Sequence, residues 1–244
     1  LTSVVIPKSV TEIGKEGIFS HCESLTSIVV EEGNSIYDSR DNCNAIIKNG
    51  NTLVAGCSTS VIPDGVQTLG YGAFSGCENL TSIVIPDSVT EIGAYAFSDC
   101  TALTEVVIPD SVTSIGWYAF KNTGLETVYF HATACEMGSN ANEGYSTFTD
   151  NANLTKFVFG ENVTKIPANA CASAKNLQKV EFEGTVTEIG ENVFFNCPSL
   201  SAIDLSNVKT IGESAFKDCT TLKVTNKNEA SENDKGQIVF SDNL

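Results

Sequence analysis

Two consecutive segments decide the fold: LTSIVIPDSVTEIGAYAFSDC at residues 80–100 and LTEVVIPDSVTSIGWYAFKNT at residues 103–123. In each, an initial leucine opens a short apolar run whose alternation predicts a strand. Pro86 ends this strand because proline cannot donate to a ladder of hydrogen bonds. Val89 and Ile92 then return the chain to the core, and the glycine that follows permits a bend. Each segment therefore predicts one turn of chain around a common core.

The same pattern recurs along nearly the whole chain, at a commonest step of 22 to 24 residues. Its leading leucines are Leu1, Leu25, Leu80, Leu103, Leu125, Leu154, Leu177, Leu200 and Leu222. A row of phenylalanines, called the Phe ladder here, comprises Phe19, Phe74, Phe97, Phe120, Phe148, Phe194 and Phe216, with Cys171 in the same place in its own unit. A fixed period of 20–29 residues is typical of leucine-rich repeats. We therefore expect a right-handed leucine-rich-repeat solenoid with stacked short β-strands, loops and short helical turns, forming one domain over residues 1–244.

Three stretches depart from the period. An insert near residues 38–60 contains Asn49-Gly50 between apolar runs, which predicts a hairpin with a type I′ turn. A polar stretch predicts a second, looped-out insert near residues 132–148. Residues 222–244 are expected either to cap the last coil as a polar hairpin or to begin a truncated repeat.

The composition excludes some classes of partner. With 30 acidic and 14 basic side chains the formal charge is −16, which repels nucleic acid and anionic membrane surfaces. No apolar run approaches the roughly 20 residues that cross a bilayer, so we expect no membrane insertion in this segment. The start at Leu1, in mid-pattern and without a methionine, suggests that a leader or more protein lies upstream. A monomer is expected.

The repeats resemble those of the BspA-like, or treponemal-type, bacterial surface proteins, whose pattern approximates LxxIxIPxxVxxIGxxAFxxC. The resemblance extends from Leu1 to about Cys219 and includes proline, glycine, Ala-Phe and cysteine at constant offsets. It implies a secreted or surface-anchored protein, extracellular in location, that adheres to host matrix, host cells or other bacteria. That family shares no catalytic residues, so the resemblance assigns none here.

The cysteines follow the repeat. Five of them, Cys22, Cys77, Cys100, Cys197 and Cys219, stand three residues after a Phe-ladder position. This spacing favours a row of small buried thiols, the Cys ladder, over a zinc site, which would need four converging ligands and short Cys-x-x-Cys pairs. Cys43 and Cys57 flank the predicted hairpin, whose turn would set them nearly opposite each other. They form either a hairpin disulfide or two free thiols.

Catalytic, metal and cofactor sites are not predicted. His21 adjoins Cys22, but neighbouring residues of a turn usually point apart and no acid is placed to orient the histidine. The acidic pairs Glu31-Glu32 and Asp38/Asp41 lack the spacing of a calcium loop. Solvated loop charges explain them better. The chain is expected not to be an enzyme.

Two surfaces are candidates for ligand binding. One is a row of outward strand positions, of which Val84, Val107, Tyr129 and the neighbouring Glu105 are the chosen members. The other is aromatic: Tyr71 and Trp117 share one repeat position, and Tyr95 and Tyr118 share the next. Exposed aromatic residues over successive coils can form a binding hot spot. The alternatives are that β-branched residues simply suit strands and that the aromatic rings only cover the Phe ladder.

These observations favour a surface or secreted adhesion module that recognises a protein or a glycan of the host or of other bacteria. One alternative is a structural spacer that extends another domain from the cell. Another is an intracellular scaffold for protein interactions, which would suit reduced thiols. The ligand itself is not identified by the sequence.

Overall fold

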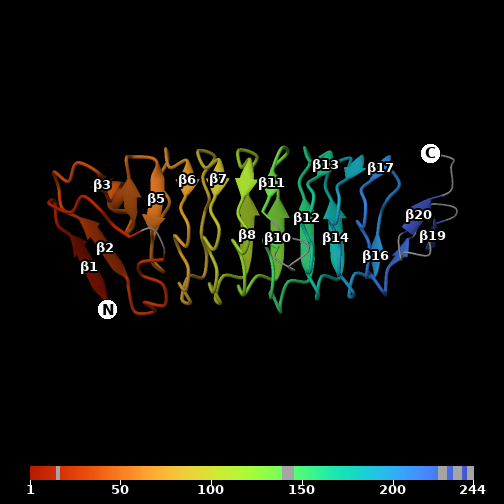
Figure 1. Ribbon diagram of the computed structural model, residues 1–244, viewed down its shortest axis with the longest axis horizontal. Helices are drawn as coiled ribbons and strands as arrows, with labels where there is room; N and C mark the ends of the chain where they lie inside the picture. Colours follow the sequence, from red (N-terminus) through yellow and green to blue (C-terminus); the bar gives the residue numbers. More distant parts are fainter. Residues whose placement is uncertain (15–16, 139–145, 225–229, 233–237, 241–244) are drawn as a thin grey trace.

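The computed structural model describes residues 1–14, 17–138, 146–224, 230–232 and 238–240. Its coils stand side by side along one long axis, and the two termini lie at opposite ends (Figure 1). The chain is a strand-rich solenoid of about nine turns with almost no helix. The predicted leucine-rich-repeat fold is thus confirmed.

The strand after each leading leucine builds the first sheet. Six parallel strands form its long part: β8 (Glu105–Ile108), β10 (Thr127–Phe130), β12 (Lys156–Phe159), β14 (Lys179–Phe182), β16 (Ala202–Ile203) and β18 (Lys223–Val224). The first two coils contribute a separate parallel pair, β1 (Ser3–Ile6) and β2 (Ser27–Val30). Val107 lies opposite Tyr129, and Tyr129 lies opposite Val158, so equivalent repeat positions form continuous rows.

Short strands on the return path of each coil build a second sheet, which the sequence analysis does not predict. Its seven-stranded part contains β3 (Tyr37–Asp38), β4 (Ile46–Lys48), β5 (Thr52–Ala55), β6 (Thr68–Leu69), β7 (Glu91–Ile92), β9 (Ser114–Ile115) and β11 (Glu136–Met137). A three-stranded part contains β13 (Lys165–Ile166), β15 (Glu188–Ile189) and β17 (Thr210–Ile211). The isoleucine three residues after the valine of each repeat, such as Ile92 after Val89, thus lies in a second parallel ladder.

The first insert is an antiparallel hairpin that extends this second sheet. Strand β4 pairs with β5, and the turn between them has positive φ at Asn49 (50°) and Gly50 (75°), as a type I′ turn requires. Strand β5 then pairs in parallel with β6, so the hairpin continues the coil stack. The single helix in the described part of the chain is the short 3₁₀ helix η1 (Arg40–Asn42), which precedes β4.

The second insert, predicted near residues 132–148, is described only at its two ends. Strand β11 pairs with β9, and Ala132 and Cys135 are buried, so residues 132–138 belong to a regular coil. Phe148 is buried as a member of the Phe ladder. The remaining polar residues, 139–145, lie outside the described part. At the C-terminal end β18 still adds to the first sheet, and β19 (Ala230–Glu232) pairs antiparallel with β20 (Ile238–Phe240); the rest of 222–244 is not described.

The Phe ladder forms the centre of the core. The ring centroids of Phe74 and Phe97 lie 5.1 Å apart with their planes 3° from parallel, and Phe120 and Phe148 continue the stack at 5.1 and 5.2 Å. All four rings are buried. Since the coil spacing equals the stacking distance of aromatic rings, each phenylalanine packs on the same residue of its neighbour.

The predicted reason for the repeated glycine is wrong. The φ angle of Gly93 lies outside the left-handed region, but a Cβ there would stand 2.7 Å from the carbonyl oxygen of Leu69 in the preceding coil. Gly116 would meet the backbone of Ala94 in the same way. Glycine is therefore needed because adjacent backbones approach closely, and its side-chain hydrogen permits that approach.

The turns that follow the second sheet are not regular helices. After the second sheet each coil turns through i to i+3 hydrogen bonds, such as Ser98 N–H to the Tyr95 carbonyl and Cys100 N–H to the Phe97 carbonyl. Tyr95 and Asp99, four residues apart, both have positive φ, at 56° and 63°. A left-handed residue in each turn interrupts any right-handed helix.

The strand predicted at residues 80–85 is not formed. In several described coils, the residue just after the first-sheet strand donates its N–H to a carbonyl of the preceding coil. Glu31, His131, Gly160 and Glu183 make this bond. Pro63, Pro86 and Pro109 hold the same position and have no N–H, and the first sheet is interrupted at these three coils. The repeat's own proline therefore breaks the first sheet between β2 and β8.

Candidate binding surfaces

The four candidate aromatic residues form one contiguous cluster, the aromatic cluster. Tyr95 lies at its centre, with ring centroids 5.3 Å from Tyr71, 5.0 Å from Trp117 and 5.4 Å from Tyr118. Trp117 and Tyr118 are 5.6 Å apart. Tilted and edge-on geometry at such distances is favourable for aromatic pairs. The repeat therefore brings residues from three coils into one patch beside the second sheet.

The outer rings of the aromatic cluster reach solvent. Tyr71 is 39% and Trp117 is 42% exposed, whereas Tyr95 and Tyr118 are half-buried. The Nζ atom of Lys121 lies 4.9 Å from the centroid of the Tyr118 ring, a cation–π contact at the edge of the patch. The patch thus combines exposed aromatic rings with a cation at its edge, and Tyr, Trp and cationic residues of this kind are common in binding hot spots.

The two central tyrosines have an unfavourable backbone conformation. Tyr95 and Tyr118 have φ of 56° and 57°, in the left-handed region that bulky residues rarely adopt. The equivalent positions of other coils carry small or amide residues that tolerate this region: Gly72, Asn169, Asn192 and Ser214. A bulky residue there costs about 1 kcal/mol or more. The sequence analysis places these tyrosines together but does not detect the strain.

The strand-row candidates lie in a different part of each coil. Val84 is 79% exposed, Val107 is 44% exposed, Glu105 is exposed and Tyr129 is half-buried. Val84, Glu105 and Val107 line a hollow of about 710 Å³ on the first-sheet side. Val158, in the same row, is buried. The row is therefore not open along its whole length, because Val158 interrupts it.

Glu181, which lies opposite Val158 in the next coil, continues the row and forms two ion pairs. Glu181 binds the Nζ atoms of Lys156 at 2.7 Å and Lys179 at 2.5 Å. These two lysines hold the pKa of the Glu181 carboxyl below its usual value through their hydrogen bonds, and the carboxyl raises the pKa of Lys156. One shared carboxylate thus reduces the repulsion between the two paired lysines.

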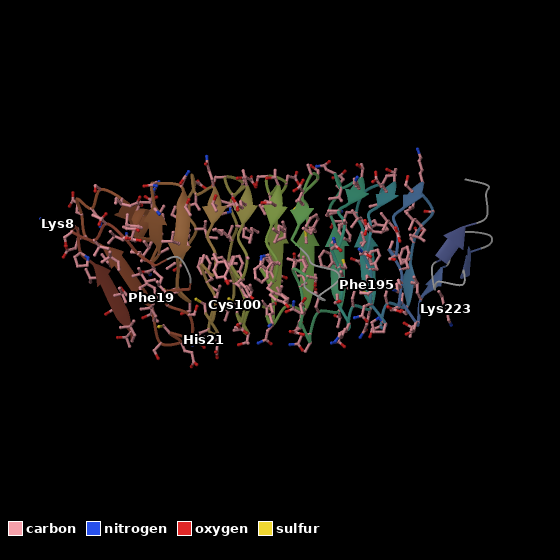
Figure 2. The ribbon with its side chains drawn as sticks, viewed as in Figure 1. Lys8, Phe19, His21, Cys100, Phe195 and Lys223 are labelled. Atoms are coloured by element: carbon pink, nitrogen blue, oxygen red, sulfur yellow. The ribbon has the colours of Figure 1, made fainter. Side chains whose placement is uncertain are left out.

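The Cys ladder packs in or against the core, with Cys22, Cys77 and Cys219 only partly buried. Cys100 and Cys197 are fully buried, and desolvation raises the pKa of both thiols. Burial also raises the pKa of Cys77 to about 12 and of Cys219 to about 11. Cys100 and Phe195, labelled in Figure 2, belong to the turns that follow the second sheet in their coils. These thiols are poor nucleophiles at neutral pH because the thiolate is disfavoured.

The hairpin-disulfide hypothesis is not supported, because Cys43 and Cys57 are free thiols. A bulge between Ile46 and Ile47 shifts the pairing, and the Cys57 thiol donates to the carbonyl of Asn44 at 3.6 Å. Cys43 and Cys57 also pack in two different clusters of the core. The bulge therefore removes the direct opposition that an unbroken hairpin would have.

Asn151 holds the Cys-ladder position in its coil, and the sequence analysis does not identify it. This residue stands three positions after Phe148 and is buried. Its amide donates to the carbonyls of Phe120 and Phe148 at 2.8 and 2.9 Å, and its oxygen accepts from Thr123 at 2.7 Å. Its spacing of three residues after a Phe-ladder residue, the same as in the Cys ladder, is the feature of the sequence that could have identified it.

Within the described ranges, no group of three or more His, Cys, Asp or Glu residues is arranged to hold a metal ion. His21 Nδ1 lies 3.5 Å from a carboxylate oxygen of Glu78, and the histidine is exposed. No helix of the described residues has the length and apolar character to cross a membrane.

Comparison with known proteins assigns the family. A model of the BspA-type leucine-rich repeat region matches residues 1–49, 50–149 and 142–242, with six copies. A leucine-rich repeat protein from Eubacterium ventriosum has a similar crystal structure, with 28% identity and a TM-score of 0.72 over 96% of this chain and 63% of that one. The pneumococcal vaccine antigen PcpA, at 19% identity and a TM-score of 0.53 over 93% and 55% of the two chains, shares the fold.

The chain spans less than two thirds of the length of both of these structures. No curated protein matches it significantly in sequence. Repeat offsets, coil geometry and the match over almost all residues agree, and the chain belongs to the BspA-type leucine-rich repeat family.

Proposed function

We propose that this chain is a non-catalytic binding module of the bacterial surface or secreted type, which adheres to a protein or glycan of the host or of other bacteria through the aromatic cluster. The observation that carries the proposal is the left-handed conformation of Tyr95 and Tyr118. A residue that costs stability in the fold, where Gly72 or Asn192 suits the same position, is explained by a role outside folding.

The surroundings of the aromatic cluster support this role. Phe74, Phe97 and Phe120 of the Phe ladder are 0% exposed, while Tyr71 and Trp117 retain about two fifths of their surface in solvent. Rings that served only to cover the ladder would be expected to bury themselves more fully. Tyrosine and tryptophan also contribute large contact areas at low entropic cost. A structural spacer would need no such patch.

The test is a binding screen with a matched pair of variants. The chain is immobilised and probed with a glycan array and with purified matrix proteins, alongside Trp117→Ala/Tyr118→Asn and the control Phe195→Ala. Asn is chosen because Asn169 and Asn192 hold the equivalent position. We expect the double variant to lose binding by tenfold or more while its melting temperature stays near the original.

The control changes another half-buried aromatic residue, Phe195, which has Lys217 5.5 Å from its ring and lies nearer the C-terminal end of the solenoid. Phe195→Ala is expected to bind normally. Binding by the double variant at full strength would contradict the assignment of the surface. A large fall in its melting temperature would instead identify the rings as packing residues. Absence of binding to every probe by the native chain would favour the spacer.

A further inference from the structure

The interrupted first sheet leaves one edge of β8 open. In the described chain, β8 pairs with β10 alone, and no backbone hydrogen bond joins β8 to residues 81–86. The carbonyls of Thr104 and Ile108 accept from Glu126 and His131 at 2.8 and 2.9 Å, so alternate residues of β8 face β10. In a parallel ladder the intervening residues, Glu105 and Val107, direct their N–H and C=O groups to the other side.

That open edge faces a cavity. The hollow of about 710 Å³ lies between residues 82–85 and 105–107, with Asp87, Pro109, Asp110, Ser111 and His131 at its sides. Its volume falls in the range of roughly 300–1,000 Å³ found for ligand pockets. Ile83 is half-buried, whereas its counterparts Val106 and Val128 are buried. The opening therefore reaches past the surface row to the layer beneath it.

The coils on both sides of the opening are tightly joined elsewhere. Gly116 N–H donates to the Ile92 carbonyl at 2.7 Å in the second sheet, and Phe97 N–H donates to the Ala119 carbonyl at 2.7 Å in the following turn. Ser111 Oγ bonds the carbonyl of Val89 at 2.7 Å. The gap is thus confined to the first-sheet side, where Pro109 lacks the N–H that would reach the Ile85 carbonyl.

The side chains around the hollow define what fits it. Asp87, Glu105 and Asp110 carry carboxylates, and no lysine or arginine is among its described lining residues. Val84 and Val107 present apolar surface between these charges. An open strand edge binds an extended main chain, and the alternation of acidic and apolar side chains suits basic residues that alternate with apolar ones. A second copy of this chain, with a charge of −16, is a poor match.

We propose that the open edge of β8 binds an extended, basic segment of a partner polypeptide as an added strand. The backbone of Glu105 and Val107 supplies the hydrogen bonds, and the carboxylates select lysine or arginine. This site is separate from the aromatic cluster and does not rest on it. It adds a peptide-binding function on another side of the coil.

The test is titration calorimetry of the whole chain, at low salt, with the synthetic probe acetyl-Lys-Val-Lys-Val-Lys-Val-amide. We expect one peptide to bind per chain and hydrogen exchange to slow at Glu105 and Val107. A peptide with N-methyl groups on the amides of one edge should bind about tenfold more weakly, since backbone hydrogen bonds are lost. An acetyl-Lys-Lys-Lys-Val-Val-Val-amide peptide of equal charge should also bind more weakly.

Two pairs of variants localise the site. Glu105→Gln/Asp110→Asn should lower the affinity for the probe about fivefold. Glu126→Gln, which changes an exposed carboxylate away from the hollow, should leave the affinity unchanged. Pro109→Ala restores the missing donor and should close the edge and weaken the probe; Pro63→Ala, in another coil, should leave its affinity unchanged. Trp117→Ala/Tyr118→Asn should also leave it unchanged.

If the N-methylated peptide or the Lys-Lys-Lys-Val-Val-Val peptide bound as tightly as the original probe, the proposal would be overturned, because charge alone would then account for the binding. Normal binding by Pro109→Ala, with the fold intact by circular dichroism, would overturn the placement at β8. Self-association that competes with the probe in sedimentation, and is lost in Pro109→Ala, would assign the edge to a second copy instead.

Discussion

The thiol of Cys100 donates a hydrogen bond to the carbonyl oxygen of Phe74, 3.2 Å away in the preceding coil. Cys219 makes the same bond to Phe194 at 3.0 Å, and Cys197 bonds the carbonyl of Cys171, which replaces phenylalanine in its coil, at 3.1 Å. In these three coils the Cys ladder therefore connects to the Phe-ladder position of the coil before it. A thiol is small enough for this position and still satisfies a buried carbonyl.

Asn151→Ala should destabilise the chain more than Cys100→Ala does. The asparagine satisfies the carbonyls of Phe120 and Phe148 and the N–H of Thr123, all in a buried site. Its loss leaves several buried groups unpaired, at a cost of about 3 kcal/mol or more, against about 1–2 kcal/mol for the thiol. Urea unfolding followed by circular dichroism measures both; equal midpoints would show that the amide network contributes little.

Gly56→Ala should destabilise the first coils. A Cβ at Gly56 would overlap the ring of Phe74, since this glycine occupies the space next to the Phe ladder in the coil that contains the hairpin. Displacement of the ring should cost about 1–3 kcal/mol. Gly14→Ala is the control, because its Cβ would meet only an ordinary contact with Ile18 at 3.6 Å. Unchanged thermal unfolding of Gly56→Ala would show that Phe74 can move freely.

Acid should weaken the sheet near β12 and β14 through Glu181. The pKa of its carboxyl is lowered by hydrogen bonds from Lys156 and Lys179, so the folded state favours the ionised form. This contribution is present above the ordinary glutamate pKa of about 4.3 and is lost as the pH falls through the lower folded value. Between about pH 6 and about pH 3, the melting temperature of Glu181→Gln should therefore fall less than that of the unchanged chain. An unchanged slope in the variant would contradict the coupling.

All nine cysteines should react with a thiol reagent in denaturant without prior reduction, because the structure holds them as free thiols. In the native protein at about pH 8, Cys100, Cys171 and Cys197 should react very slowly, since burial raises the pKa of each and blocks access. Mass spectrometry of the labelled peptides identifies them. Recovery of only seven reactive thiols before reduction would restore the Cys43–Cys57 disulfide.

Tyr118→Asn should retain more stability than Tyr118→Ala. Both remove the ring contacts with Tyr95 and Trp117, but only asparagine is well suited to the left-handed conformation that this position keeps. The expected difference is about 0.5–1 kcal/mol, measured as urea midpoints. Alanine equal to asparagine would indicate that the backbone relaxes and that the tyrosine carries no strain.

The periodic part of the fold follows directly from the sequence. Constant offsets predict the Phe ladder, the Cys ladder, the strand rows and the grouping of Tyr71, Tyr95, Trp117 and Tyr118, because each coil repeats the same position. The type I′ turn at Asn49-Gly50 is equally local, and it was correctly predicted. These features need only the repeat and the conformational preferences of single residues.

The features that were missed depend on the relation between two coils. Pro109 ends its own strand, as expected, but its larger effect is on the segment before it, which loses a donor at Ile85. The bulge between Ile46 and Ile47 shifts the pairing of β4 with β5 and so removes the direct opposition of Cys43 and Cys57. Neither feature can be predicted from one segment of the sequence, because each depends on how two separate segments of backbone pair.

The interrupted first sheet also has a mechanical consequence. The hydrogen bonds between coils run along the long axis, and the termini lie at opposite ends (Figure 1). A pull on the two ends therefore loads those bonds directly, one coil boundary after another. Between β2 and β8 the first sheet carries no load, so the second sheet, the turns that follow it and the ring stack hold these coils together. Under tension, the solenoid should extend first in this interrupted region and leave the six-stranded part intact.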